Sequence, residues 1–324
     1  MNIIGHQKII ESFERTIERN SVAHAHLIVG DNGIGKSVIA QKFACDILNI
    51  DYKENHVDIV NYKLNKNSFG VDDVRKVIEE INKKPYELNK KVVILYGGEK
   101  ITMQGQNALL KTIESPPKGV YIFILSTSLD SMLDTIKSRC QIHKLSPLSK
   151  GEMLEFIKRD FKDVQDSMLN SLISFSAGVP GRVSSFLEDV SFDNIRDVVI
   201  DILDVISQRD EFKAINMITL NSKRNIEISN ISNEIRVDIK GKEDVFLESF
   251  VSIIRDIIVY KEVSNKELII NIDKINRLED LAVSLSYKKM NKIIDIIDET
   301  RMNLVSNTNS WLTFNTMIRK MLED

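Results

Sequence analysis

The chain has 324 residues, of which 43% are hydrophobic and 28% are charged, a composition typical of soluble globular proteins. Its net charge of -3 provides no basic field over the whole chain, so any contact with DNA must come from a local patch or from helix N-termini. The N-terminus lacks a signal-peptide pattern, and no apolar stretch approaches the roughly 18 residues of a membrane helix. We therefore expect a soluble, cytoplasmic protein without a membrane partner.

Strand and helix patterns alternate over about the first 147 residues. Apolar residues at helical spacing predict helices at about 6–19, after the glycines of 30–37, and at about 71–83 and 104–114. Strands of a parallel sheet are continuous apolar runs, because helices cover both faces of the sheet. Such runs occur at 27–29, 57–60, 92–95 and 120–125. The pattern predicts an α/β domain with a parallel sheet over residues 1–147.

Helical patterns dominate from about residue 148 onward. We predict a small helical domain over 148–205, interrupted by a turn at 178–181, and an all-α domain over 206–324. Apolar stripes at helical spacing near 246–257, 290–297 and 311–321 are typical of an ordinary helical core. The polar stretch 221–244 indicates a loop or an irregular insertion.

Residues 30–37 read GDNGIGKS and match the phosphate-binding pattern G-x-x-x-x-G-K-[ST] between a predicted strand and a predicted helix. Gly30, Gly33 and Gly35 let backbone N–H groups turn toward phosphates, and the helix N-terminus adds partial positive charge. Lys36 is expected to reach the β- and γ-phosphates, and the Ser37 hydroxyl to ligate Mg²⁺ where nucleotide binds. The predicted cofactor is thus ATP or ADP with Mg²⁺. The alternative is an inherited P-loop that no longer binds nucleotide tightly.

The acidic residues that a P-loop ATPase needs after a second strand are missing. The strand at 92–95 is followed by Tyr96 and Gly97, where an aspartate for the magnesium shell and a glutamate that orients water usually stand. Glu99 is either a substitute carboxylate or a solvent-facing acid at a helix start. We therefore predict that the chain hydrolyses ATP negligibly.

Several segments carry a family resemblance. They are Gly5-His6-Gln7, the HAHL of 24–27, the NALLKTIESPP of 107–117, the TIKSRC of 135–140, the GVPGR of 178–182 and Arg255-Asp256-Ile257. Together they resemble the bacterial clamp-loader branch of the AAA+ family, and within it the delta-prime group. The gamma and tau motors of that branch keep an intact acidic pair after the second strand. Subunits of the delta-prime group typically lack full ATPase machinery yet keep the Ser-Arg-Cys segment, which is the combination seen in this sequence.

The resemblance implies a P-loop AAA+ domain, a helical lid and a helical collar that joins a hetero-oligomer. It implies a non-motor role in DNA polymerase III, in which the complex loads a sliding clamp on primed DNA during replication in bacteria. The implied partners are the gamma/tau and delta subunits, with the clamp and primer-template DNA contacted through the complex. It also implies association with the nucleoid during replication.

Three site residues follow from the resemblance. Arg139 resembles the arginine finger that AAA+ subunits extend into a neighbour's ATP site, where a guanidinium stabilises charge in the transition state. Arg182 resembles a second sensor, for which a plain salt bridge is the alternative. Thr127 lies near the first sensor position, and its alternative role is a turn-forming hydroxyl.

One departure concerns zinc. Many clamp-loader subunits carry a four-cysteine module after the P-loop helix, whereas this chain has only Cys45 and Cys140, so we predict no structural zinc. The two cysteines are expected to be reduced thiols. Two other functions stay open from the sequence: an active clamp-loader motor, and an unrelated P-loop kinase or nucleotide hydrolase.

Overall fold

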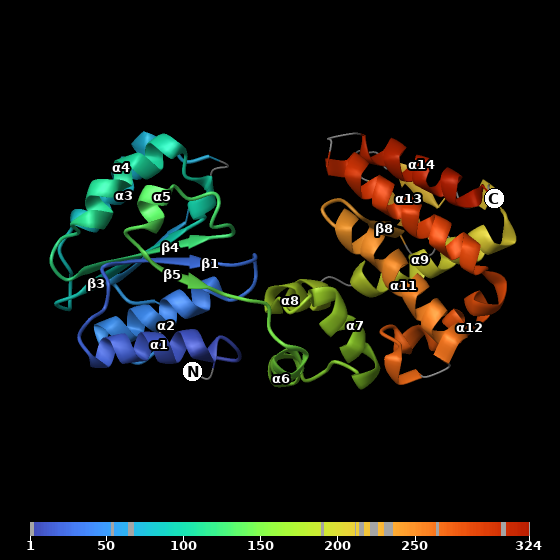
Figure 1. The fold of residues 1–324 in the computed structure, drawn as a ribbon, viewed down its shortest axis with the longest axis horizontal. Coiled ribbons are helices and arrows are strands. Elements are labelled where there is room, and N and C mark those ends of the chain that lie inside the picture. Colours follow the sequence, from blue (N-terminus) through green and yellow to red (C-terminus); the bar gives the residue numbers. More distant parts are fainter. Residues whose placement is uncertain are drawn as a thin grey trace. The chain divides into compact units, whose positions relative to one another are not determined.

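The structure is a computed structural model that divides into two compact units (Figure 1). The first unit comprises Met1–Phe156 and Gly178–Gly181, and the second comprises Ile157–Ala177 and Arg182–Asp324. The described residues are 3–52, 55–63, 68–188, 191–210, 212–213, 217–220, 226–229, 236–263, 266–305 and 309–323.

The first unit is built on a five-stranded parallel sheet in the order β2-β3-β4-β1-β5. The strands are β1 (Ala25–Val29), β2 (Ile59–Lys63), β3 (Lys91–Tyr96), β4 (Val120–Ser126) and β5 (Gln141–Lys144). Every residue of β1 is buried, because helices cover both faces. All five strands are parallel, so the segments that follow β1, β3 and β4 meet at one edge of the sheet.

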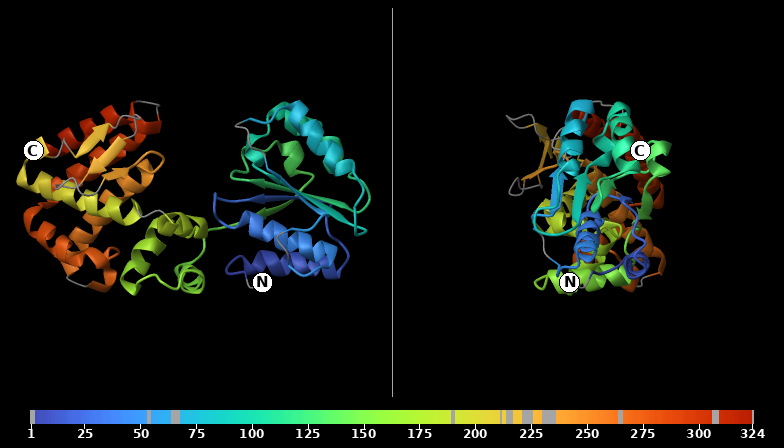
Figure 2. Two further views of the ribbon diagram at one scale, coloured as in Figure 1. Left: turned by 180° about the vertical axis from the view of Figure 1, so that it is seen from behind. Right: turned by 90° about the vertical axis from the view of Figure 1, so that its left-hand side faces the viewer.

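Helices form a layer on each face of this sheet (Figures 1 and 2). Helices α1 (Gln7–Glu18) and α2 (Lys36–Leu48) cover one face, and α3 (Val71–Asn82), α4 (Met103–Glu114) and the short α5 (Asp134–Lys137) cover the other. On the first face, the rings of Phe13 and Phe43 stack with centroids 3.7 Å apart, and Phe123 of β4 lies beside them. The aromatic contacts join both helices to the sheet.

The predicted α/β domain with a parallel sheet is confirmed, but the sequence analysis did not predict strand β5 or helix α5. Strand β5 has only four residues and is an edge strand whose Ile142 is exposed, so it lacks a continuous apolar run. Helix α5 also has four residues, too few to show helical periodicity. Strand β2 begins two residues later than expected, because Val57 lies 54% exposed before it.

The remainder of the chain is mostly helical, in agreement with the prediction. The helices are α6 (Lys150–Asp160), α7 (Asp166–Ser176), α8 (Pro180–Glu188), α9 (Ser191–Gln208), α11 (Glu243–Val263), α12 (Ile275–Ser284), α13 (Tyr287–Val305) and α14 (Ser310–Leu322). The apolar stripes of α11, α13 and α14 form one buried core with α9 and α12, which includes Phe246, Phe250 and Phe314. None of the described helices is long and apolar enough to cross a membrane.

A small antiparallel sheet interrupts the predicted all-α domain over 206–324, partly within the stretch 221–244, where we expected a loop or an irregular insertion. Its strands are β6 (Ile218–Leu220), β7 (Ile226–Ser229) and β8 (Arg236–Asp238), and parts of the stretch 221–244 fall outside the described residues. Ile228 of β7 and Val237 of β8 are buried and pair across the two strands. The strands have three or four residues each, so each contains only one or two inward-facing apolar residues among polar neighbours. This alternation is too short to predict a strand from the sequence.

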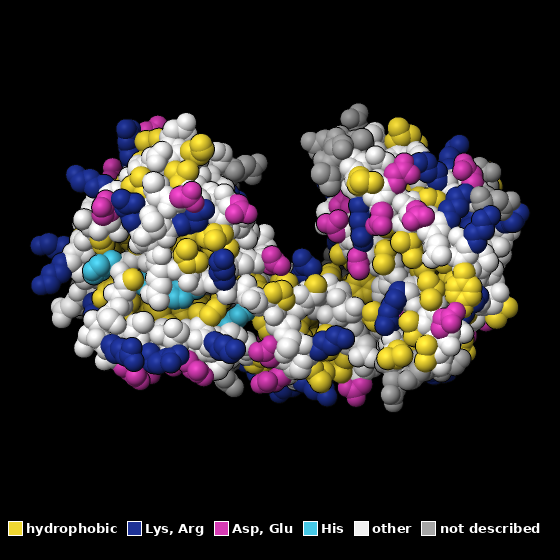
Figure 3. Space-filling model, in the orientation of Figure 1, with side chains coloured by type: hydrophobic (Ala, Val, Ile, Leu, Met, Phe, Trp, Pro, Cys, Tyr) yellow, Lys and Arg dark blue, Asp and Glu magenta, His cyan; other side chains and the backbone are white. Residues whose placement is uncertain are grey.

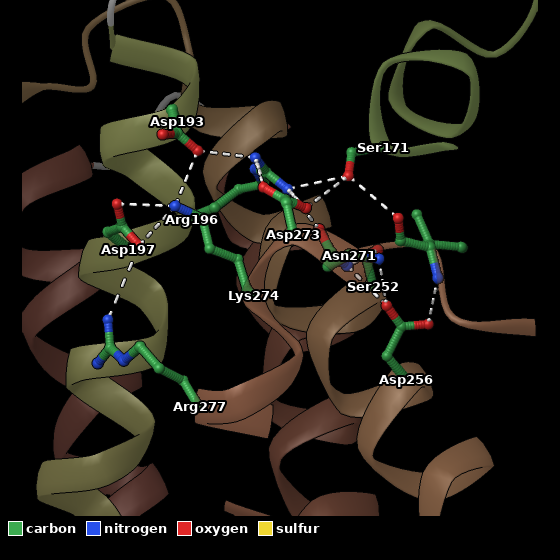
Figure 4. Close-up of polar contacts among 11 residues, drawn as sticks. Ser171, Asp193, Arg196, Asp197, Ser252, Asp256, Asn271, Asp273, Lys274 and Arg277 are labelled. Carbon is green, nitrogen blue, oxygen red and sulfur yellow. Dashed lines mark hydrogen bonds and ion pairs between the residues drawn. The ribbon is translucent and has the colours of Figure 1, made fainter. Parts of the chain in front are cut away.

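A buried arginine organises the polar interior of the second unit (Figure 4). The Arg196 side chain on α9 is fully buried, and its guanidinium donates to Ser171 of α7, to Asn271 and to both carboxylate oxygens of Asp273, with nitrogen–oxygen distances of 2.6–3.1 Å. Asp193 accepts a further bond at 2.7 Å. The planar fork of arginine suits this arrangement, because several acceptors surround one side chain.

Candidate nucleotide-binding site

The P-loop connects strand β1 to a helix, as the sequence predicts. Strand β1 ends at Val29, and α2 begins at Lys36. Gly33 and Gly35 have φ angles of 82° and 110°, a region that residues with a Cβ rarely adopt. Gly30 lies against the backbone of Leu145, where a Cβ would stand 3.0 Å from the carbonyl oxygen. The three glycines therefore give the loop its path, and α2 starts with its N-terminus at the loop.

A pocket of about 570 Å³ lies at this edge of the sheet. Among the expected site residues, the structure brings five to it: Gly33, Gly35, Lys36, Ser37 and Thr127. Its lining also includes Asn32, Val38, Lys63, Tyr96, Gly97, Glu99, Lys100, Leu125, Phe156, Pro180 and Gly181. The volume lies within the range of ordinary small-molecule sites, which is about 300–1,000 Å³.

The side chain of Lys36 is turned onto the P-loop itself. Its Nζ donates to the carbonyl oxygens of Gly30 at 2.5 Å and of Asp31 at 2.8 Å. Burial lowers the pKa of Lys36, while the carboxylates of Glu99 and Asp31 act in the opposite direction. To bond phosphate oxygens, the ammonium must exchange these two carbonyls for a ligand, which offers negative charge as well as acceptors.

No carboxylate stands directly after β3. Tyr96 is the last residue of the strand, and its hydroxyl donates to Asn61 Oδ1 of β2 at 2.9 Å. Gly97, with a φ of 79°, has no side chain to offer. Glu99 lies in the first turn of a short 3-10 helix (Gly98–Lys100), is half-buried and lines the pocket, so both alternatives for it, a substitute carboxylate and an acid at a helix start, stay open.

Glu99 is fixed by the segment that follows β4. Its Oε2 accepts a hydrogen bond from the backbone N–H of Thr127 at 3.0 Å. Thr127 also lines the pocket, and its main-chain N–H makes this hydrogen bond, while its role as a first sensor stays a prediction. Among the described residues, no group of three or more His, Cys, Asp or Glu side chains could hold a metal ion.

The turn at 178–181 closes against the P-loop. The backbone N–H of Gly181 donates to the carbonyl of Gly33, and the carbonyl of Gly178 accepts from the N–H of Leu148. A Cβ on Gly181 would stand 2.6 Å from the Cα of Gly33, so only glycine permits this approach. The sequence predicted a turn here from the break in the helical pattern, but it did not predict that this turn contacts the P-loop.

Arg139 is exposed in the first unit, between α5 and β5. Its NH1 donates to the carbonyl of Thr135 at 3.1 Å, and its Nε lies 3.6 Å from Glu114 Oε2. The Arg139 side chain is 36% exposed, and its NH1 also donates to the Ser138 hydroxyl at 3.4 Å. Its position is compatible with a contact outside this chain.

Arg182 lies on α8 and lines a separate pocket of about 580 Å³ within the second unit. The charged neighbours on that pocket are Lys242, Asp244, Glu248 and Arg301. Both alternatives for Arg182, a nucleotide sensor and a salt bridge, remain expectations.

Two protein-family models match the chain. The family described as DNA polymerase III, delta subunit matches residues 5–149, and the one described as DNA polymerase III, delta subunit, C terminal matches residues 204–321. The chain belongs to the clamp-loader subunits of DNA polymerase III. An unrelated kinase or nucleotide hydrolase is thereby set aside.

Relatives of more than one clamp-loader type resemble this subunit. It is 24% identical to a replication factor C small subunit of Methanococcus vannielii over 98% of this chain and 94% of that relative. It is 36% identical to the DNA polymerase III subunit delta' of Escherichia coli, over 38% of this chain and 36% of that relative. A DNA polymerase III subunit gamma of Buchnera aphidicola is 26% identical over 49% of this chain and 48% of that relative.

Proposed function

We propose that this chain is a non-motor, delta-prime-type subunit of a bacterial clamp loader, which helps to load a sliding clamp onto primed DNA. The observation that carries the proposal is the end of β3, where Tyr96 and Gly97 stand in place of the acidic pair of a P-loop ATPase. Tyr96 donates its hydroxyl to Asn61, and Gly97 has no side chain, so neither can hold a metal shell or orient an attacking water.

Arg139 is the residue through which this non-motor subunit contributes to ATP hydrolysis in a neighbouring subunit. A guanidinium that reaches the γ-phosphate in a neighbour's site stabilises the transition state, an effect worth about 10³–10⁵ in rate for such fingers. Reaching a neighbour requires Arg139 to leave Glu114, an exposed partner at 3.6 Å. Surface ion pairs of this kind are worth about 0–1 kcal/mol, so the release costs little.

We also propose that the chain is a cytoplasmic subunit with a P-loop domain at 1–147, a lid at 148–205 and a collar at 206–324. Its partners are gamma/tau and delta subunits, and through them the clamp and primer-template DNA. Basic and acidic side chains are interspersed over each unit on the face in Figure 3, and the net charge is -3. This charge pattern supports DNA contact through the complex, because no single strong basic field is available from the whole chain.

The test is clamp- and DNA-stimulated ATP hydrolysis by the assembled loader. With Arg139→Ala, we expect hydrolysis to drop several-fold or more while the assembly stays intact by size-exclusion chromatography. Arg139→Lys should not restore it, because an ammonium lacks the bidentate fork. The matched control is Arg75→Ala, an exposed arginine of α3 paired with Asp72. Unchanged hydrolysis with Arg139→Ala would remove the finger role and leave a structural subunit.

An active motor is the second function with a specific observation in its favour. The replication factor C small subunit resembles this chain over almost its whole length, and Glu99 offers one carboxylate in the pocket. This alternative requires intrinsic ATP hydrolysis by the purified chain, which our proposal does not.

A further inference from the structure

The pocket at the P-loop is unsuited to magnesium. In a P-loop enzyme, Mg²⁺ is held by the P-loop hydroxyl and by an acid from the second strand. Ser37 offers the hydroxyl here, but Tyr96 and Gly97 offer no carboxylate. The remaining acid, Glu99, already accepts from the N–H of Thr127 and lies close enough to Lys36 to raise its pKa against the effect of burial. The described lining therefore offers Mg²⁺ one hydroxyl and a single carboxylate, and that carboxylate is already engaged by a backbone N–H and lies near an ammonium group.

Positive side chains line the pocket. Lys36, Lys63 and Lys100 line it, and Glu99 is the only acid among its described lining residues. Three lysines and one glutamate leave a formal charge of +2 on this lining.

The fold explains how Lys63 comes to line this pocket. Lys63 ends β2 and pairs in register with Tyr96 at the end of β3. Its Nζ lies 5.8 Å from the centre of the Tyr96 ring. Tyr96 occupies the position where the acid usually stands, and it lies beside the Lys63 ammonium without neutralising its charge. An aspartate at this position would have neutralised the charge of Lys63.

We propose that this P-loop binds a nucleoside triphosphate without a divalent metal, and that Lys63 and Lys100 supply the positive charge that Mg²⁺ provides in a motor subunit. The proposal rests on nucleotide binding at the P-loop and is independent of the role of Arg139. Ammonium groups bind phosphate as compact point charges and need no fixed coordination geometry. The bound triphosphate is then a stable part of the subunit, because neither a metal nor an acid after β3 is available to promote its hydrolysis.

The experiment is a calorimetric titration of the purified full chain with ATP, in EDTA and again in excess MgCl₂. We expect the two dissociation constants to agree within about threefold. An affinity that falls more than about tenfold when Mg²⁺ is removed overturns the proposal. Absence of binding in both buffers also overturns it, and leaves the test of Arg139 in the assembled loader unaffected.

Variants assign the effect to the lysines. Lys63→Ala and Lys100→Ala should each weaken binding of ATP in EDTA by about three- to tenfold, and added Mg²⁺ should recover part of the loss. Lys118→Ala, at an exposed lysine of the same unit away from the pocket lining, is the matched control. Equal affinities for all three variants would contradict the charge replacement. The double variant Tyr96→Asp with Gly97→Glu should make binding depend on Mg²⁺.

Discussion

The backbone N–H of Gly181 donates to the carbonyl oxygen of Gly33 at 2.9 Å. Gly33 belongs to the P-loop, and Gly181 stands at the start of α8, so two segments far apart in sequence share one hydrogen bond. The Cα of Gly33 would lie within 2.6 Å of any Cβ at position 181. The contact joins two backbones, and no flexible side chain could yield to relieve a clash.

Gly181→Ala should therefore destabilise the first unit. Forcing an extra carbon into a close backbone contact costs about 1–3 kcal/mol, and it would also displace the P-loop. We expect a lower free energy of unfolding in urea and a weaker affinity for ATP.

Gly151→Ala is the control for this substitution. Gly151 lies in α6, has ordinary backbone angles and has no atom within 4 Å of a Cβ placed on it. Alanine there should be neutral or should stabilise the chain by up to about 1 kcal/mol. An equal decrease in the free energy of unfolding for Gly181→Ala and Gly151→Ala would show that the close approach of Gly181 to Gly33 does not make alanine more destabilising at position 181.

A buried histidine pair predicts loss of stability in acid. Nε2 of His26 donates to the carbonyl of Ala23 at 2.8 Å, so the neutral ring accepts at Nδ1 from Nε2–H of His143 at 3.1 Å. Burial and the nearby His143 lower the pKa of His26 to about 3, and burial lowers the pKa of His143 to about 4. Both rings are therefore neutral in the folded chain over the ordinary pH range.

The unfolded chain takes up protons at these histidines near pH 6.5, whereas the folded chain does so only near pH 4 and pH 3. Stability is thus fully present above about pH 6.5 and declines as pH falls toward 4, by on the order of 1–2 kcal/mol per histidine at pH 5. Urea unfolding at several pH values measures this slope. His143→Gln should reduce the slope, and His24→Gln, at an exposed histidine, should change it only slightly, because His24 is the last of the causes that lower the pKa of His26.

Arg196 should be among the costliest residues to replace in the second unit. Arg196→Met leaves Asp273 and its neighbours without their cation, and breaking a buried pair in this way costs about 3–5 kcal/mol. Arg196→Lys should recover little, because one ammonium cannot meet the acceptors that the fork reaches. The expected readout is a lower midpoint of thermal unfolding.

Arg301→Met is the matched control for Arg196. Arg301 is 37% exposed and pairs with Glu248 at 2.6 Å. An exposed pair contributes about 0–1 kcal/mol, so the midpoint should move little. If the two arginine variants unfold at the same temperature, the buried network of Figure 4 does not stabilise this unit as described.

ATP hydrolysis by the isolated chain should be negligible, because the positions of Tyr96 and Gly97 carry no acid. Steady-state phosphate release from purified protein measures it, with Lys36→Ala as the background. Turnover of several molecules per second that Lys36→Ala abolishes would instead make the chain an active motor.

The sequence alone determined the alternating strands and helices, the P-loop and the missing acids, because each depends on residues that are neighbours in the chain. The continuous apolar runs of β1, β3 and β4 identify buried parallel strands locally. Tyr96 and Gly97 are identified by their place directly after one such run. Short elements such as β5 and β7 were missed, because three or four residues carry no clear period.

Only the tertiary structure decided what surrounds the phosphates. Strand β2 brings Lys63 beside Tyr96 through parallel pairing, and a loop after β4 turns the N–H of Thr127 onto Glu99. The approach of Gly181 to Gly33 depends on the return of the chain after α7. None of these contacts follows from spacing in the sequence, because they arise from strand order and register, which are set by the burial of the whole sheet.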